Sequence, residues 1–189
     1  MDVLTLLASP RGDGNTQAIL SRVESALREE GRKIDRIDLT KLRIGGCRSC
    51  VACAESADEP GCVQMDDAQG VFAKMLAADA ILFATPLYMW SYAGQLKPLL
   101  DRTLCLARKY GTAEHRSFVE GKPTALLVAC GGGIENNVDA IQIAFPRLAD
   151  YLKLDDRGVW IFPNCTDAKR LPNTHGNQAR ELAGALMGQ

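Results

Sequence analysis

Short apolar runs alternate along the chain with stretches whose apolar residues recur every three or four positions. Continuous runs at residues 2–8, 80–84, 124–130 and 157–162 are typical of buried β-strands. Residues 33–39 alternate polar and apolar positions, which predicts a strand nearer the edge of a sheet. The chain therefore offers five strands.

Helical periodicity follows each of these runs. It predicts helices from Thr16, after a cap at Asp66, from about Gly94, from Val138 and over residues 177–188. The helix from Gly94 would carry the apolar stripe Leu96, Leu99, Leu100 and Leu104. Strands that alternate with helices predict an α/β fold, with a mostly parallel sheet covered on both faces. We expect residues 1–189 to form a single domain.

Composition and charge narrow the class of protein. The chain has 189 residues, 47% of them hydrophobic, which argues against a disordered polymer. Its formal net charge of −1 gives no reason to expect nucleic acid or an anionic membrane as partner. The apolar start is too short for a secretory signal and lacks a basic segment before it. We therefore expect a cytoplasmic protein whose seven cysteines are thiols, ligands or redox groups rather than structural disulfides.

The turn "SPRGDGNT" joins the first strand to the first helix. Its small and polar residues can direct donors at an anion, and its arginine adds a positive charge; the candidates are Ser9, Arg11, Gly14, Asn15 and Thr16. An ordinary helix-capping turn has a similar composition, and the turn has neither the GxGxxG nor the P-loop pattern. It predicts a phosphate site only if other loops at the same edge of the sheet support it.

Two other loops give that support. The third strand is followed by an aromatic and apolar segment that suits a flat ring, with Pro86 expected to end the strand, namely Pro86, Leu87, Tyr88, Met89 and Trp90. The fourth strand is followed by glycines that expose bare backbone, Gly131 and Gly132 among them. In a doubly wound sheet, ligands bind at the carboxyl ends of the strands, where these three loops meet.

The motifs "SPRGDGNT" and "TPLYMWSYAGQLKPLLDR" together resemble the flavodoxin-like NAD(P)H-dependent FMN reductases. The resemblance implies a five-stranded sheet in the order 2-1-3-4-5. It also implies FMN, with its phosphate on the first turn and its ring against residues 86–90, near Gly131 and Gly132. Electrons would pass from NAD(P)H to a small acceptor such as a quinone or free flavin. Apolar loops around an open ring favour a homodimer or homotetramer.

A cysteine run in the loop 45–65, after the second strand, remains to be explained. Cys47, Cys50, Cys53 and Cys62 form a C-x2-C-x2-C-x8-C pattern. The run resembles that of the iron–sulfur flavoproteins, which implies a [4Fe-4S] cluster, although the last gap is longer than that family suggests. Zinc, a redox disulfide or inert thiols are the alternatives.

We favour a flavin oxidoreductase without a metal centre. An iron–sulfur electron carrier and a metal-binding regulatory module are the other hypotheses. Because FMN supplies the chemistry, we assign no catalytic acid, base or metal ligand. His115 and His175 are interpreted as solvated loop residues, and Lys97 and Arg102 as solvated or ion-paired helix positions.

Overall fold

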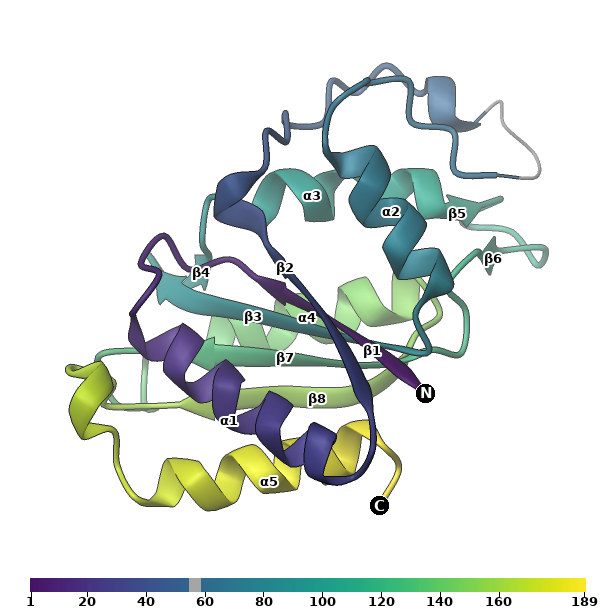
Figure 1. The fold of residues 1–189 in the computed structure, drawn as a ribbon. Coiled ribbons are helices and arrows are strands. Elements are labelled where there is room, and N and C mark those ends of the chain that lie inside the picture. Colours follow the sequence, from purple (N-terminus) through teal and green to yellow (C-terminus); the bar gives the residue numbers. More distant parts are fainter. Residues whose placement is uncertain (55–58) are drawn as a thin grey trace.

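A computed structural model describes residues 1–54 and 59–189, and in that part five strands form a parallel sheet (Figure 1). Their order is β2-β1-β3-β7-β8. The strands are β1 (Asp2–Leu7), β2 (Lys33–Asp38), β3 (Ala80–Tyr88), β7 (Pro123–Ala129) and β8 (Asp155–Phe162). Numbered along the chain, this is the order 2-1-3-4-5, so the predicted flavodoxin-like α/β fold is confirmed.

Helices cover both faces of this sheet, as Figure 1 shows. They are α1 (Asn15–Glu29), α2 (Ala68–Ala77), α3 (Lys97–Arg102), α4 (Asp139–Tyr151) and α5 (Thr174–Leu186). Successive side chains of β1 point to opposite faces of the sheet and so belong to different parts of the core. Val3 and Leu7 pack with α1 and α5, whereas Leu4 and Leu6 pack with α2, α3 and α4. Each face of the sheet therefore has its own apolar cluster.

Helix α2 has Asp67 at its N-cap rather than the predicted Asp66, and two other helices begin three residues away from their predicted starts. Helix α3 begins at Lys97 rather than near Gly94, and a 3-10 turn (Thr103–Leu106) follows it, so Leu104 leaves the predicted stripe and is 41% exposed. The late start places Pro98 in the first turn, where a missing N–H costs little. Helix α5 begins three residues before 177 and contains His175, which is buried rather than solvated.

The third strand continues beyond the predicted stop at Pro86. Pro86 pairs with Ala129 of β7, and β3 then turns back into the short strand β4 (Ser91–Tyr92). On the other side, the ladder with β1 has already ended at Ala84. The carbonyl of Ala84 accepts from the N–H of Ala8 on the β1 side. Because the backbone groups of alternate residues in a strand face the same neighbour, the N–H that Pro86 lacks would also point to the β1 side, beyond the end of that ladder. The proline therefore costs no ladder hydrogen bond and does not end the strand.

The loop 45–65 lies between β2 and α2, and residues 55–58 of it are outside the described part. Its described portions are largely irregular and contain one 3-10 turn (Ala52–Ala54). They lie over the end of the molecule that carries α3 and the small hairpin of β5 (Ala107–Arg108) and β6 (Arg116–Ser117) (Figure 1). The loop is thus separate from the turn that follows β1.

Candidate functional site

A cleft of about 180 Å³, here called the edge cleft, lies at the carboxyl ends of β1, β3 and β7. It gathers nine of the twelve residues predicted for the cofactor: Ser9, Arg11, Gly14, Asn15, Thr16, Pro86, Leu87, Tyr88 and Gly131. Ala129 and Cys165 complete the lining. Segments far apart in the sequence therefore meet where a doubly wound sheet binds its ligands.

The start of α1 supplies unused donors to the edge cleft. Gly14 occupies the N-cap position with an extended backbone, and within the described residues no side chain caps the helix. The first hydrogen bond of the helix runs from the N–H of Ala18 to the carbonyl of Gly14, which leaves the N–H groups of residues 15–17 without helical acceptors. Such N–H groups, together with the helix dipole, favour an anion.

The turn before α1 is tight at one glycine and open at the other. A Cβ on Gly14 would lie 3.0 Å from the Cβ of Arg11 and 3.3 Å from its carbonyl oxygen, whereas a Cβ on Gly12 would meet nothing within 4 Å. The hydroxyl of Ser9 accepts from the N–H of Arg11 at 3.3 Å and fixes the turn. Only Gly14 is therefore required by close packing.

Asn15 connects this turn to the far side of the edge cleft. Its Nδ2 donates to the carbonyl oxygen of Cys165 at 2.6 Å, and its Oδ1 is buried with no hydrogen-bond partner among the described residues. A buried acceptor without a partner costs about 1–3 kcal/mol. A ligand hydroxyl at this point would satisfy it, so the donor and acceptor pattern fits a polyhydroxyl chain with a terminal phosphate.

Three predicted residues do not line the edge cleft. Met89 and Trp90 form the tip of the β3–β4 hairpin with φ angles of 47° and 61°, and they are 81% and 55% exposed. Consecutive left-handed residues are typical of a type I′ turn, which normally takes Asn and Gly, so two bulky residues are strained there. Gly132 instead packs beneath Asn137, and its carbonyl accepts from the N–H of Asn164 at 3.0 Å.

A second cavity, of about 70 Å³ and here called the cysteine cavity, lies in the loop 45–65. Five thiols line it together with Arg102: those of Cys47, Cys50, Cys53, Cys62 and Cys105. Among the described residues, no three His, Cys, Asp or Glu side chains converge enough to hold one metal ion. The thiols therefore share a cavity, but in the described residues they form no site for a single metal ion.

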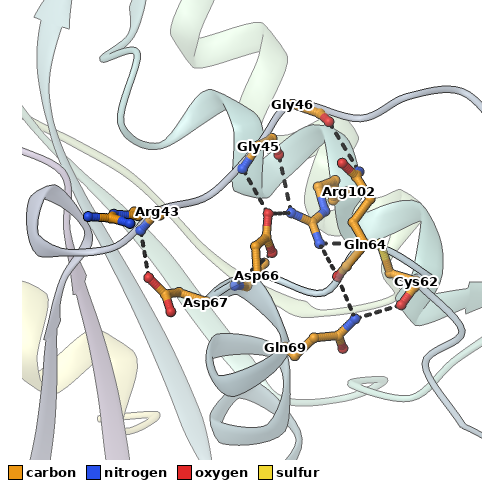
Figure 2. Close-up of polar contacts among 10 residues, drawn as sticks. Arg43, Gly45, Gly46, Cys62, Gln64, Asp66, Asp67, Gln69 and Arg102 are labelled. Atoms are coloured by element: carbon orange, nitrogen blue, oxygen red, sulfur yellow. Dashed lines mark hydrogen bonds and ion pairs between the residues drawn. The ribbon is translucent and has the colours of Figure 1, made fainter.

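Arg102 ties this cavity to the body of the protein (Figure 2). Its Nη1 donates to Asp66 Oδ2 at 2.6 Å and to the carbonyl of Gly45 at 3.2 Å. Its Nη2 donates to the Sγ of Cys62 at 3.4 Å and to the carbonyl of Gln64 at 3.3 Å. The arginine is therefore ion-paired with Asp66, as one of the two alternatives predicted. Its side chain is only 1% exposed, so it is buried rather than solvated.

Burial affects the protonation of Asp66 differently from that of the buried thiols Cys105 and Cys165. Desolvation opposes ionisation of Asp66, but hydrogen bonds from Arg102 and from the N–H groups of Gly45 and Ala68 hold its pKa below the usual value. Burial raises the pKa of Cys105 to about 12 and that of Cys165 to about 11. The ion pair at the loop is therefore charged at neutral pH, while these two thiols are neutral.

The sequence does not predict three features of the structure, two of them at the sites. Cys165 was not among the residues predicted for the cofactor, although it follows β8 at the same edge of the sheet as the other loops. Gly131 was predicted because ligands bind at the carboxyl ends of the strands, and the same argument applies to Cys165. Nothing in the local sequence marks the burial of Arg102 or of His175, because both depend on distant segments of the chain.

The chain matches the sequence profile described as NADPH-dependent FMN reductase over residues 1–153. It is 35% identical over 142 residues to an iron–sulfur flavoprotein of Methanosarcina thermophila, which spans 75% of this chain and 71% of that protein. It is 26% identical over 149 residues to an FMN-dependent NADH:quinone oxidoreductase of Methylobacterium radiotolerans, which spans 78% of this chain and 72% of the relative.

Solved structures show the same fold. The NAD(P)H:quinone oxidoreductase of Methanothermobacter marburgensis superposes with a TM-score of 0.71 at 19% identity, over 100% of this chain and 98% of that one. In the described part of this chain, each helix is too short or too polar to cross a membrane. The profile match, the curated relatives and the sheet order agree: the chain belongs to the NADPH-dependent FMN reductase family and is an FMN-dependent oxidoreductase.

Proposed function

We propose that the chain binds FMN in the edge cleft and passes electrons from NAD(P)H to a small acceptor such as a quinone or free flavin. The observation that carries the proposal is the convergence of the turn before α1 with the end of β3 and the loop after β7 in one cleft. When bound, FMN accepts hydride from a nicotinamide and returns one or two electrons.

The edge cleft is large enough to enclose only part of FMN. Its volume of about 180 Å³ is below the roughly 300–1,000 Å³ of sites that enclose a drug-sized ligand. We assign the phosphate to Ser9, Arg11, Gly14, Asn15 and Thr16, which meet the helix N-terminus. Pro86, Leu87, Tyr88 and Gly131 would hold the ring on the side of the hairpin tip, and FMN bound there would exchange electrons with a nicotinamide and an acceptor.

The lining assigns binding and orientation to the protein. Within the described residues it contains no carboxylate and no imidazole, and its one thiol, Cys165, is neutral because burial raises its pKa to about 11. Arg11 and the helix N-terminus would hold the anionic end, and backbone groups at Gly131 would hold the polar rim of the ring. We assign no proton transfer to a side chain.

Purification under native conditions tests this proposal directly. We expect a yellow protein that releases FMN on denaturation, identified by mass, and that oxidises NADH or NADPH when a quinone or free flavin is present. Bound FMN with no oxidation of either nicotinamide would instead support an electron carrier. A colourless protein that does not take up added FMN would refute the assignment of the edge cleft.

The hairpin tip favours a homodimer or homotetramer. Tyr88, Met89 and Trp90 are 41%, 81% and 55% exposed and lie together beside the edge cleft. A contiguous apolar tip on a single chain is typical of an interaction site. A second copy seated on it would cover the open part of the ring, and sedimentation velocity of wild type against Trp90→Ser would test this assembly.

We place the protein in the cytoplasm. All seven cysteines are free thiols in the structure, which is typical of a reducing compartment, and NAD(P)H is a cytoplasmic electron donor. Fractionation of the native host, with detection by an antibody, would test this location. Recovery from an oxidising compartment would contradict it.

A metal centre on the cysteine cavity is a second candidate function. The observation that favours it is that Cys47, Cys50, Cys53 and Cys62 line one cavity although residues 55–58 intervene. Thiolates spread around one cavity suit an iron–sulfur cluster better than a single zinc ion, and Arg102 supplies positive charge to offset theirs. Between the cysteines, Ser49 and Val51 have φ angles of 51° and 55°, a strained conformation that is frequent at functional loops. Iron, sulfide and zinc analysis of protein prepared without oxygen would test this candidate.

A further inference from the structure

Arg102 lies at the neck of the loop 45–65, where the two ends of the loop meet (Figure 2). The neck consists of Gly45 and Gly46 at the beginning of the loop and residues 62–64 at its end. The side chain of Gln64 donates to the carbonyl of Gly46 at 3.1 Å, which joins these ends directly. Arg102 reaches both ends from α3, so one guanidinium fixes the loop to the helical layer.

The guanidinium also has a contact that closing a loop does not need. Backbone acceptors at Gly45 and Gln64, with the carboxylate of Asp66, already hold the neck. The same Nη2 that donates to Gln64 also donates to the Sγ of Cys62 at 3.4 Å. Cys62 is thus the thiol of the run that the arginine holds, and both residues line the cysteine cavity.

The backbone of Cys62 is fixed independently of the arginine. The Nε2 of Gln69, on α2, donates to the carbonyl of Cys62 at 2.6 Å and to that of Gln64 at 3.0 Å. Gln69 therefore places the main chain, and Arg102 places the sulfur. This division separates a general structural role from a role in aiming one thiol.

We propose that Arg102 is the positioning residue of the cysteine cavity, where it holds the sulfur of Cys62 as the fourth ligand beside Cys47, Cys50 and Cys53. The proposal rests on the second candidate function, the metal centre. It also explains how a cysteine separated by a gap of eight residues lies beside the other three. The contacts of Arg102 with Gly45, Gln64 and Cys62, here called the clamp, set its place, rather than the spacing in the sequence.

Thiol protection in the metal-loaded chain tests this role. The chain is reconstituted without oxygen using ferrous iron and sulfide, then treated with N-ethylmaleimide, and label at each cysteine is measured by peptide mass. Wild type and the matched surface control Arg147→Gln, on α4, should protect all four cysteines. In Arg102→Gln we expect Cys62 to gain about tenfold more label than in the control, because loss of one charge-assisted hydrogen bond changes an equilibrium by about that factor.

The other cysteines and the cofactor distinguish positioning from misfolding. In Arg102→Gln, Cys47, Cys50 and Cys53 should stay protected and FMN should stay bound. Equal protection of Cys62 in Arg102→Gln and in the control would overturn the proposal. Loss of protection at all four cysteines together with loss of FMN would overturn it as well, because the arginine would then be only structural.

Two further measurements keep the test decisive. If Arg102→Gln does not fold, Arg102→Lys keeps the charge but loses the planar fork, and we expect it to expose Cys62 while the other three remain protected; full protection would overturn the proposal. Hydrogen exchange of the metal-free chain measures the neck alone, at the N–H of Gly45, which donates to Asp66 at 2.9 Å. Its exchange should be about tenfold faster in Arg102→Gln than in Arg147→Gln.

A wild-type chain that takes up no iron would refute the metal centre and, with it, the ligand role of Cys62. The exchange result would still show whether Arg102 holds the neck. Failure of the proposed centre and failure of the clamp therefore give different results.

Discussion

The edge cleft and the cysteine cavity are shaped by different forces. The edge cleft is formed where parallel strands end, so the hydrogen-bonded ladder of the sheet sets the distance between its walls. The cysteine cavity lies in an irregular loop whose shape depends on one buried arginine and a few side-chain contacts. A site that uses the sheet can be recognised from strand order, whereas a site that uses a clamp depends on one distant residue.

The largest expected effect tests the anion site of the edge cleft. The double variant Arg11→Gln and Thr16→Val removes a charge and a hydroxyl at the helix N-terminus. If each contact to the phosphate contributes about 1.5–3 kcal/mol, FMN should bind about a thousandfold more weakly. Fluorescence quenching of added FMN measures the change.

The double variant should keep its fold, although Thr16 is more deeply buried than a surface turn would suggest. Valine keeps the volume of that side chain, and far-ultraviolet circular dichroism should match wild type. A dissociation constant within threefold of wild type would remove the phosphate from this turn. The cysteine cavity should be unaffected in either case.

A pair of glycine variants sharpens the argument about the turn. Gly14→Ala would force Arg11 to move, because the new Cβ would lie 3.0 Å from that side chain. We expect FMN binding to weaken about tenfold, since overpacking costs about 1–3 kcal/mol. Gly12→Ala is the matched control: its Cβ meets open space, so affinity should change less than twofold. Equal effects at both glycines would contradict the packing explanation.

His175 gives a pH-dependent test of the face that carries α1 and α5. It packs edge-on against Phe162, and burial, then the nearby charge of Arg22, lowers its pKa from 6.5. The unfolded chain therefore binds this proton at higher pH than the folded chain. The stability contribution is complete above pH 6.5 and is lost as the pH falls through the lower folded pKa, by at most about 1.4 kcal/mol per pH unit.

Urea unfolding between pH 7 and pH 5 measures this slope. His175→Gln should unfold at a midpoint that depends less on pH than that of wild type. An unchanged slope would mean that other groups account for the acid sensitivity. Because His175 lies on α5, away from the loop 45–65, the pH dependence of the urea midpoint reports on the sheet and its α1–α5 face, and not on the cysteine cavity.

The smallest expected effect tests whether the two sites are separable. Cys62→Ser replaces a sulfur of the cysteine cavity and leaves each residue of the edge cleft in place. FMN occupancy and the rate of NAD(P)H oxidation with a quinone should stay within about twofold of wild type, while any iron is lost. Loss of flavin activity together with iron would show that the acceptor is reached through the metal centre.

The sequence predicts the fold and much of the edge cleft for physical reasons that can be named. Burial of parallel strands gives continuous apolar runs, and the carboxyl ends of such strands meet at one edge, so the loops after β1, β3 and β7 could be joined in advance. The predicted stop at Pro86 was wrong because a proline is tolerated where the neighbouring strand has already ended.

Other features required tertiary information. Met89 and Trp90 lie at the hairpin tip, outside the lining of the edge cleft, because a two-residue turn places them there; their residue types do not indicate a left-handed backbone. Arg102 has the sequence context of an exposed helix end. Its burial depends on Asp66, which comes from a segment 36 residues away.

The position of Arg102 in the chain also sets an order of events during synthesis. Cys62 emerges 40 residues before the arginine that holds it, so the clamp cannot exist until α3 has been made. At about 5–20 residues per second, this interval lasts about 2–8 s. Throughout it the cysteine run is an unclamped thiol-rich segment, exposed to any metal donor or oxidant that meets the growing chain.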